Sequence, residues 1–275
     1  MLPTPDSRPE TQAAGPATPR PVVLVTGAAR RIGRSIALHL AGRGYDLAVH
    51  CRGSRDEAEA TAADLRACGA AAEVFVADLA VEDQCRALLP QVLARFGRVD
   101  AVVNNASRFD YDDALSADTA GLDSHWRANL AAPVLLAQAL AAHLKARAAA
   151  GDAAKGCVVN LLDQKLWNPN PDYFSYTLSK AALREATVLL AQALAPQVRV
   201  VGVAPGVTLV SGPMTEAQHQ QAPALTPLRR SSTPEDIARA VLFLIESPAI
   251  TGTTLLVDGG QHLSGQARDV LFLTR

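Results

Sequence analysis

Short apolar runs alternate along the chain with longer stretches in which apolar residues recur every three or four positions. A short run that is apolar throughout predicts a strand buried on both faces, and the longer periodicity predicts an amphipathic helix. The predicted strands are 22–27, 45–51, 72–79, 100–106, 156–162, 198–206 and 253–260. The predicted helices are 34–44, 55–69, 81–97, 119–147, 173–194 and 234–247. Strands and helices that alternate in this way predict a parallel sheet between two layers of helices.

The fold class that follows is α/β: a single Rossmann-like domain whose doubly wound, parallel, seven-stranded sheet carries helices on both faces. We expect this domain to span residues 21–262, with no internal repeat and no second domain. Residues 1–20 are rich in proline, alanine and threonine and lack aliphatic periodicity, which predicts a disordered N-terminal tail. Residues 263–275 are expected to form a C-terminal tail that docks on a neighbouring subunit or frays.

Composition and charge exclude several classes of function. The 275 residues are 49% hydrophobic and 19% charged, with a formal net charge of -1, which is typical of one soluble globular domain. Such a charge provides no electrostatic surface for nucleic acid or an anionic membrane, and no apolar run is long enough to span a bilayer. The 4 cysteines have neither CxxC spacing nor a metal-type pairing with histidine. We therefore expect a cytoplasmic protein with a small-molecule substrate and no metal.

The first predicted strand runs into a loop with two glycines, Thr26-Gly27-Ala28-Ala29-Arg30-Arg31-Ile32-Gly33, at the start of a helix. Gly27 permits a tight turn, and Gly33 permits close packing of the helix on the strand. The free N–H groups at the start of the helix can then hold a pyrophosphate. An ordinary turn could also carry these glycines, but the position at the start of the domain favours a dinucleotide site.

The end of the second predicted strand indicates which dinucleotide binds. A site for NAD usually has an aspartate or glutamate there, which binds the ribose 2′-hydroxyl. This strand ends in His50-Cys51-Arg52-Gly53-Ser54, which contains no acid. Arg52, with Ser54 and His50, can pair with a 2′-phosphate, so NADPH is the predicted cofactor. A merely solvated Arg52 is the alternative.

Tyr176 and Lys180 are four residues apart in a predicted helix, so they lie on one face of it. There the ammonium group can stabilise a partly ionised phenol and make Tyr176 a proton donor or acceptor near neutral pH. Tyr173 is the rival phenol, but the residue four positions after it is Thr177, which has no charge to act in this way. The acid Asp163, which precedes this helix, indicates the kind of substrate group that receives the proton.

The chain from about 21 to 262 resembles a short-chain dehydrogenase/reductase. The motifs that carry the resemblance are 26–33, Asp78, Asn104-Asn105-Ala106, Asn129, Tyr176 with Lys180, and Pro205-Gly206, in the family's order. Few unrelated sequences would contain all of these motifs, so the resemblance is specific. The cofactor-binding residues assigned from the patterns above and from the resemblance are Gly27, Arg30, Arg31, Ile32, Gly33, His50, Arg52, Ser54, Asp78, Leu79, Asn105, Ala106, Ser107, Tyr176, Lys180, Pro205 and Gly206.

The resemblance also implies roles for single residues. It implies that Asp78 binds the adenine and that Asn105 and Ala106 line the adenosine-ribose region. Lys180 would hold the nicotinamide ribose, and Asn129 would anchor a chain of waters that feeds protons to Lys180. Taken alone, Asp78 could instead be a helix cap and Asn129 a satisfied polar group.

Three departures from the usual family pattern resemble the pteridine reductase branch, which reduces pterins and dihydrofolate. Arg31 replaces the middle glycine of the cofactor loop, Ser107 with Phe109 follows the fourth strand, and Asp163 replaces the catalytic serine. The spacing of 13 residues between Asp163 and Tyr176 fits this branch too. The resemblance implies that Phe109 stacks on the pterin, that Ser107 contacts it, and that Arg31 contacts both phosphate and pterin. For Phe109, a core aromatic beneath a loop is the alternative.

The hypothesis is therefore an NADPH-dependent pteridine reductase for dihydropterins of the biopterin or monapterin type, with dihydrofolate as a further candidate substrate. Asp163 could give the proton itself or orient a water or Tyr176, and the residues alone leave this open. The substrate-binding residues assigned are Arg31, Ser107, Phe109, Asp163 and Tyr176, and the catalytic ones are Asp163, Tyr176, Lys180 and Asn129.

Two other functions remain as alternatives. One is an NADPH-dependent carbonyl or 3-oxoacyl-thioester reductase of the same family, against which Asp163 and Phe109 argue. The other is a non-enzymatic NADPH-binding regulator, against which the intact pair of Tyr176 and Lys180 argues.

Two further segments suggest how the site is covered and how subunits meet. Residues 207–230 are irregular and rich in proline, which predicts a loop over the substrate. The helix 173–194 carries small residues on its expected outer face, and the family resemblance suggests a homotetramer, although helix propensity alone would explain them. These small residues are Ala181, Ala182, Ala186, Ala191 and Ala193.

Overall fold

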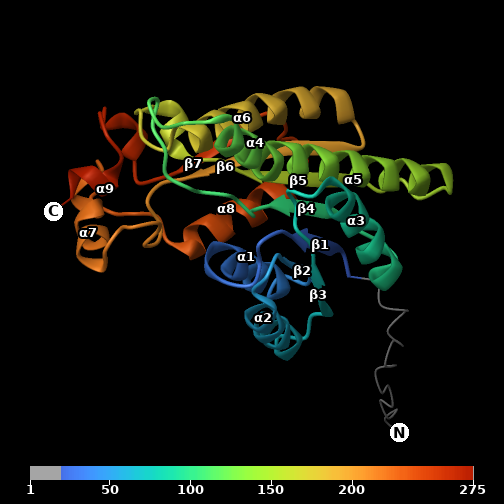
Figure 1. The fold of residues 1–275 in the computed structure, drawn as a ribbon. Helices are drawn as coiled ribbons and strands as arrows, with labels where there is room; N and C mark the ends of the chain where they lie inside the picture. The colour runs from blue at the N-terminus through green and yellow to red at the C-terminus, as the bar shows by residue number, and fades with distance from the viewer. Residues whose placement is uncertain (1–19, 275) are drawn as a thin grey trace, which may run out of the picture.

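The computed structural model describes residues 20–274, which form one parallel sheet covered on both faces by helices (Figure 1). The seven strands have the order β3-β2-β1-β4-β5-β6-β7, and every neighbouring pair is parallel. They are β1 (Val22–Val25), β2 (Asp46–Cys51), β3 (Ala72–Val76), β4 (Ala101–Asn104), β5 (Gly156–Leu161), β6 (Val198–Pro205) and β7 (Thr254–Val257). The predicted fold class is confirmed, and all seven predicted strands are present.

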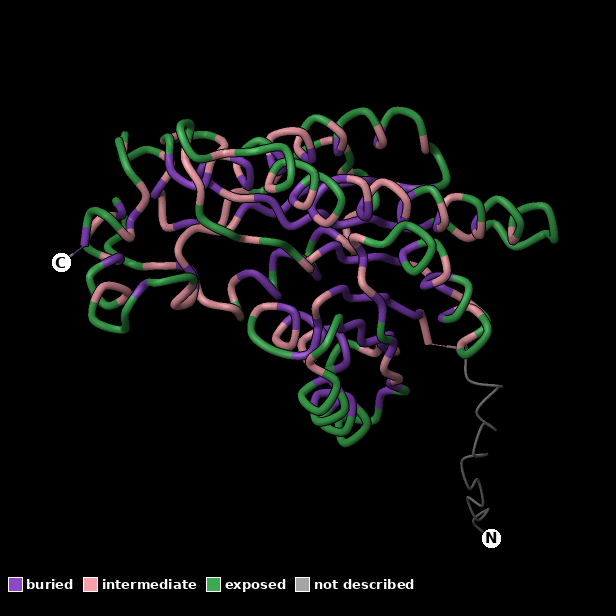
Figure 2. Tube along the Cα trace, in the orientation of Figure 1, coloured by how far each residue is buried: buried purple, intermediate pink, exposed green. Residues whose placement is uncertain are grey.

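Six longer helices make the two outer layers. α1 (Arg31–Ala41), α2 (Arg55–Ala67) and α8 (Pro234–Glu246) pack on one face, and α3 (Glu82–Phe96), α5 (Ala132–Ala149) and α6 (Phe174–Leu194) pack on the other. Successive side chains of a strand point to opposite faces, so each apolar strand packs against both layers of helices. Val23 and Val25 pack in the first layer, whereas Val22 and Leu24 pack in the second. The central strands β1, β4 and β5 are consequently buried along their length, whereas the edge strands β3 and β7 are partly exposed (Figure 2).

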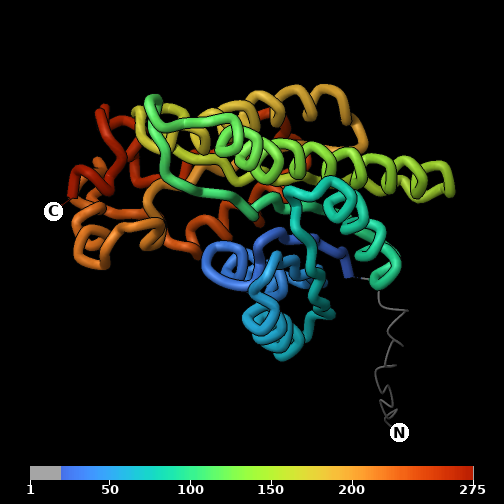
Figure 3. Tube along the Cα trace, in the orientation of Figure 1, coloured from blue at the N-terminus to red at the C-terminus, as the bar shows by residue number. Residues whose placement is uncertain are grey.

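The strand order changes direction at β1, which lies between β2 and β4. From β1 the chain adds β2 and β3 on one side, and it then crosses back to place β4 on the other side, as the course of the colours shows (Figure 3). Loops that leave neighbouring strands in opposite directions open a crevice at their carboxyl ends.

The predicted helix 119–147 is interrupted in the structure. It consists of α4 (Thr119–Trp126), a π-helical turn η1 (Arg127–Ala131) and α5. The physical reason is Pro133, which has no N–H and stands where an α-helix would supply the donor for the carbonyl of Asn129. The interruption therefore falls on a residue that the sequence had assigned to the site.

Several short helices were not predicted, because they are too short to show a hydrophobic period. Residues 207–230 are less irregular than expected, since they contain α7 (Glu216–Gln221), which begins with a capping box of Thr215 and Gln218. The remaining short elements are η2 (Gln164–Trp167), η3 (Ala222–Leu225), η4 (Gln261–Leu263) and α9 (Val270–Leu273). None of the helices between residues 20 and 274 is long and apolar enough to cross a membrane.

Both ends of the described chain belong to the fold. Of the predicted N-terminal tail, 1–20, residues 1–19 lie outside the described residues. Arg20 is described, and it belongs to the folded domain and not to a tail. Its guanidinium donates to the carbonyls of Gly44 and Ala41, at 3.0 and 3.1 Å. At the other end α9 packs on its own chain, where Val270 is buried beside Met214. The C-terminal segment is therefore a docked part of this domain.

Candidate active site

The carboxyl ends of the strands border a cavity of about 750 Å³. Its walls come from the segments that follow β1 through β6, which is the place where open α/β sheets bind ligands. All predicted site residues except Asn129 line this cavity. They are Gly27, Arg30, Arg31, Ile32, Gly33, His50, Arg52, Ser54, Asp78, Leu79, Asn105, Ala106, Ser107, Phe109, Asp163, Tyr176, Lys180, Pro205 and Gly206.

The loop between β1 and α1 is packed so closely that two positions require glycine. Gly27 has a φ of 64°, in the left-handed region that glycine adopts without strain. A Cβ atom on Gly33 would lie 2.2 Å from the Gly27 carbonyl oxygen. The Asn105 amide donates to the carbonyls of Thr26 and Gly27, at 2.8 and 3.1 Å. Asn105 thus fixes the shape of this loop from the end of β4.

Replacement of Gly33 by alanine tests that packing. Because the added methyl group meets backbone, we expect Gly33→Ala to lower the free energy of unfolding by about 1–3 kcal/mol and to weaken NADPH binding. Gly42→Ala is the matched control, since its Cβ would meet only ordinary contacts at 3.6 and 3.7 Å. Chemical unfolding and NADPH titration of both variants give the comparison. Equal stability of the two variants would contradict the packing argument.

Arg31 keeps a glycine-like backbone at the position where it replaces the family's glycine. Its φ is 57°, a conformation that costs a side-chain-bearing residue about 1–2 kcal/mol. Such strain persists where the surrounding structure imposes it, often at functional sites. The Arg31 guanidinium makes no hydrogen bond or ion pair with the rest of residues 20–274, so it is free to meet an anionic ligand in the cavity.

His50 has a different role from the one expected. Its Nδ1 accepts from the Gly27 amide at 3.1 Å and its Nε2 donates to the Ala77 carbonyl at 3.0 Å. Burial also lowers the pKa of His50, so the ring is neutral. Both nitrogens are occupied, and His50 therefore holds the cofactor loop instead of pairing with a phosphate.

Arg52 and Ser54 lie in the cavity wall next to His50. Arg52 is exposed and has no hydrogen bond or ion pair with any other described residue. Asp78, after β3, accepts the Ala80 amide on Oδ1 at 2.9 Å and keeps its second oxygen without a partner among residues 20–274. Asp78 is thus both a local turn residue and a free acceptor.

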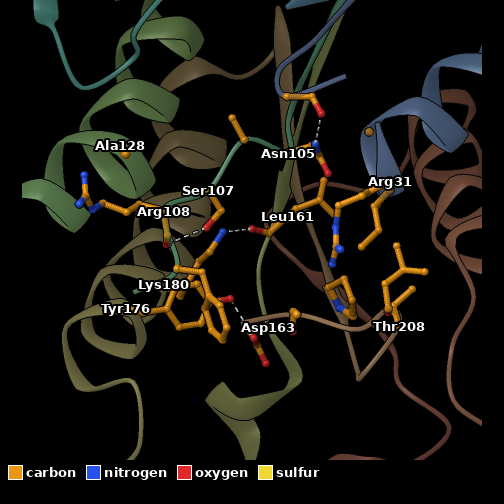
Figure 4. A pocket seen from close by; sticks show the side chains of 18 of the residues that line it. Arg31, Asn105, Ser107, Arg108, Ala128, Leu161, Asp163, Tyr176, Lys180 and Thr208 are labelled. Atoms are coloured by element: carbon orange, nitrogen blue, oxygen red, sulfur yellow. Dashed lines mark hydrogen bonds between the residues drawn. The ribbon is translucent and has the colours of Figure 1, made fainter. Parts of the chain in front are cut away.

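Tyr176, Lys180 and Asp163 meet on one side of the cavity, across from Arg31 and Thr208 (Figure 4). α6 presents Tyr176 and Lys180 on one face, as predicted, and β5 leads directly into Asp163. The Tyr176 hydroxyl donates to Asp163 Oδ2 at 2.8 Å. The Lys180 ammonium donates to the Leu161 carbonyl at 2.6 Å and lies 5.8 Å from the centre of the Tyr176 ring.

Burial controls the ionisation of these three groups. It raises the pKa of Asp163, although Lys165 and Lys180 act in the opposite direction. It also raises the pKa of Tyr176 well above its ordinary value, and the Asp163 carboxylate adds to this. Burial lowers the pKa of Lys180 to about 8. Tyr176 is consequently a neutral phenol held by a carboxyl group, and its pKa shifts in the direction opposite to the one expected from Lys180.

Asn129 stands behind the cavity wall, with all its side-chain hydrogen-bonding capacity in use. Its amide group donates to the Arg108 carbonyl and to Ser179 Oγ, at 2.9 and 3.0 Å. Its Oδ1 accepts from the Arg108 amide at 2.7 Å and from Ser107 Oγ at 3.2 Å. The side chain therefore ties the loop after β4 to α6 and has no place left for a water.

Phe109 lies at the cavity with aromatic support behind it. Its ring stacks on Tyr173 with centroids 4.2 Å apart and meets Tyr176 edge-on at 4.7 Å. Tyr173 is buried and does not line the cavity, and burial raises its pKa to about 12. The rival phenol therefore supports Phe109, while Tyr176 faces the cavity.

The sequence reasoning missed one wall of the cavity. Lys165, in η2, is buried two residues after Asp163, and its ammonium donates to the carbonyl of Asp172. Gln266, Asp269 and Val270, from the C-terminal segment, also line the cavity. The available signal was Asp269, the single acid among residues 263–275.

The loop between β1 and α1, the cavity and the buried pair of Tyr176 and Lys180 are together typical of a nicotinamide-dinucleotide oxidoreductase. Comparison with known proteins identifies the family. A family model described as "Enoyl-(Acyl carrier protein) reductase" matches residues 27–262. The 3-oxoacyl-[acyl-carrier-protein] reductase FabG of Staphylococcus epidermidis is 32% identical, over 87% of this chain and 98% of its own. The chain belongs to the short-chain dehydrogenase/reductase family.

Solved structures are also similar to this chain. FolM alternative dihydrofolate reductase 1 from Brucella canis, crystallised with NADP, is 41% identical with a TM-score of 0.81. The match covers 88% of this chain and 94% of that one. The corresponding Brucella suis protein, also in complex with NADP, is 41% identical with a TM-score of 0.80, over 88% and 95% of the two chains.

Proposed function

We propose that this chain is an NADPH-dependent pteridine reductase that reduces dihydropterins of the biopterin or monapterin type, and dihydrofolate, to the tetrahydro forms. The observation that carries the proposal is the carboxyl group of Asp163, hydrogen-bonded to the Tyr176 hydroxyl at 2.8 Å. Serine, the family's usual residue there, suits a ketone oxygen, whereas a ring imine needs a proton at nitrogen. The likeness to NADP-bound FolM alternative dihydrofolate reductases supports the same choice.

The cavity fits NADPH. The close Gly27–Gly33 contact fixes the loop against the start of α1, which faces the same cavity and offers free N–H groups to a pyrophosphate. Arg52 and Ser54 would hold the 2′-phosphate, and Lys180 would hold the nicotinamide ribose. When bound, NADPH supplies the hydride. The residues of the chain supply orientation and the proton.

Proton delivery falls to the pair of Tyr176 and Asp163. A neutral phenol next to an ionised carboxylate is a poor acid, because losing its proton would place two negative charges together. Protonation of Asp163, which its burial favours, removes that obstacle. The pair then gives one proton to the ring nitrogen and retains the other.

The test of this function is NADPH oxidation with purified protein. We expect turnover with 7,8-dihydrobiopterin, 7,8-dihydromonapterin or 7,8-dihydrofolate that exceeds turnover with ketones and 3-oxoacyl thioesters. Turnover restricted to the thioesters would refute the proposal and leave a reductase of the FabG kind.

The proposed preference for NADPH over NADH depends on Arg52. Because a charge-assisted hydrogen bond is lost, we expect Arg52→Ala to lower kcat/KM for NADPH by about 10–100-fold while kcat/KM for NADH changes little. Arg55→Ala is the matched control, since Arg55 is an exposed arginine three residues further on, at the start of α2, that does not line the cavity. Steady-state kinetics with both cofactors decide. Equal use of NADPH and NADH by the unaltered protein would refute the assignment.

The second candidate function is reduction of a 3-oxoacyl thioester. The observation in its favour is the match to FabG proteins and to a protein assigned as ketoacyl reductase 2 of the granaticin polyketide synthase of Streptomyces violaceoruber, 37% identical over 88% of this chain and 96% of its own. Asp163 argues against it, because this acid stands where ketone reductases of the family carry the serine hydroxyl that binds the ketone oxygen.

We propose a homotetramer as the assembly, with α6 as a contact helix. Its exposed apolar residues are Leu178, Val188 and Leu189. Ala191, assigned above to the outer face, is instead buried in the core of its own subunit. Light scattering measures the assembly, and a monomer would exclude it.

A further inference from the structure

The C-terminal segment returns to the substrate end of the cavity, far from the motifs that define the family. α9 lies next to α7 (Figure 1), and the Gln218 amide donates to the Leu271 carbonyl at 3.1 Å. From this position Gln266, Asp269 and Val270 reach the cavity wall. The segment therefore adds side chains to the same space as Asp163 and Tyr176.

An ion pair fixes this segment to the loop that precedes α6. Arg268 binds the buried carboxylate of Asp172 through Nη2 to Oδ1 at 2.7 Å and through Nε to Oδ2 at 2.9 Å. The Asp269 amide donates to the same Oδ2 at 2.7 Å. A two-pronged arginine–carboxylate contact is directional, so the clamp sets the orientation of the next residue, Asp269.

The Asp269 carboxylate is only partly used by the protein. Its Oδ1 accepts the Leu271 amide at 3.1 Å, and its Oδ2 has no hydrogen bond or ion pair with any described residue. Asp163 differs, because both its oxygens are engaged, one by the Lys165 amide and one by Tyr176, each at 2.8 Å. Of the two carboxylates, Asp269 is the one with an unshared oxygen for a ligand.

Electrostatics favour a ligand that brings hydrogen-bond donors. Burial raises the pKa of Asp269, and the charges of Asp163 and Asp172 act in the same direction, against the cation of Lys165. A partly buried carboxylate with one oxygen that lacks a donor is costly, and N–H groups of a ligand would offset that cost. A fatty acyl chain offers no such donors.

We infer that Asp269 is a specificity-determining residue that accepts two adjacent N–H donors of the substrate heterocycle, a ring N–H and the exocyclic amine beside it, one on Oδ2 and one on the second lone pair of Oδ1. A pterin carries this pair on its 2-amino-4-oxopyrimidine edge, where it matches a carboxylate as a guanidinium does. The inference rests on the proposed function and deepens it. In this arrangement Asp163 takes part in proton transfer, and Asp269 recognises the heterocycle.

The experiment compares two heterocycles that differ at one position. Pterin has an amine at carbon 2, whereas lumazine has an oxygen there and so presents an acceptor in place of the donor. Dissociation constants for both are measured by calorimetry on the full chain with NADP⁺ bound. We expect the unaltered protein to favour pterin by about tenfold or more. In Asp269→Asn that preference is lost, because the amide Oδ1 stays on the Leu271 N–H and its Nδ2 presents a donor, which suits the oxygen of lumazine.

The variant separates recognition from folding. Asparagine caps a helix as well as aspartate does, so the contact with the Leu271 amide and the melting temperature are retained. NADP⁺ affinity is also unchanged, and kcat/KM for a dihydropterin falls mainly through KM. Asp83→Asn, an exposed acid of α3 outside the cavity, is the control and behaves as the unaltered protein.

Two results would overturn the inference, and they are distinguishable. If the unaltered protein reduces dihydropterins and Asp269→Asn keeps the full preference for pterin over lumazine, the assignment of Asp269 fails alone. If the unaltered protein binds neither heterocycle, the proposed function fails together with it.

Discussion

Asp163→Ser lowers kcat for dihydropterin reduction by about 10²–10⁴-fold, the range for loss of a general acid. The residue holds the Tyr176 hydroxyl at 2.8 Å, and serine cannot carry the proton that a buried carboxylic acid carries. Serine still caps η2, so the contact with the Lys165 amide is retained and the fold is preserved. Single-turnover measurements at saturating NADPH give the rate of the reduction step.

The pH profile of the same two proteins provides the control. Because burial raises the pKa of Asp163, its acid form persists to higher pH than for an exposed aspartate. The rate of the unaltered protein is therefore highest below that pKa and falls as the pH rises through it. Asp163→Ser lacks this limb, while its affinity for NADPH is unchanged. An unaltered pterin rate in Asp163→Ser would remove the assignment of this residue.

Tyr176→Phe lowers kcat by a comparable factor, about 10²–10⁴-fold, because the hydroxyl that contacts Asp163 and faces the cavity is lost. The phenylalanine ring keeps the edge-on contact with Phe109 at 4.7 Å, so the aromatic cluster stays in place. NADPH titration by fluorescence and kcat with a dihydropterin are measured together.

The expected combination is retained cofactor binding with lost turnover. Tyr173→Phe is the matched control, since Tyr173 stacks behind Phe109 without lining the cavity, and it should keep most of the activity. Equal losses in the two variants would show that the aromatic cluster matters for folding and that Tyr176 has no special part in catalysis.

The fold follows from hydrophobic pattern, because each strand of a sheet covered on both faces must be apolar on both sides. β1 and β5 are buried along their whole length, and their runs stand out in the sequence. The break near Asn129 could have been inferred from Pro133, yet a continuous apolar period concealed it. Short-range pattern therefore predicts elements better than it predicts their interruptions.

The positions of site residues were predicted correctly for those residue types that have one dominant chemical use. Tyr176, Lys180 and Asp163 come together as expected, since helix spacing and strand order fix them. His50 was misjudged because its role depends on which partners surround the ring, a property of the tertiary structure. Asp269 was missed for the same reason, since nothing local indicates that the end of the chain folds back over the cavity.

The central claim is that a carboxyl group faces a heterocycle laid against the nicotinamide ring, and a crystal structure with NADP⁺ and a dihydropterin tests it most directly. The predicted result is a pteridine ring stacked between the nicotinamide and Phe109, with Tyr176 and Asp163 at the nitrogen that receives the proton. An Asp163 side chain turned away from both rings would contradict the claim, and a reductase without preference for pterins would remain.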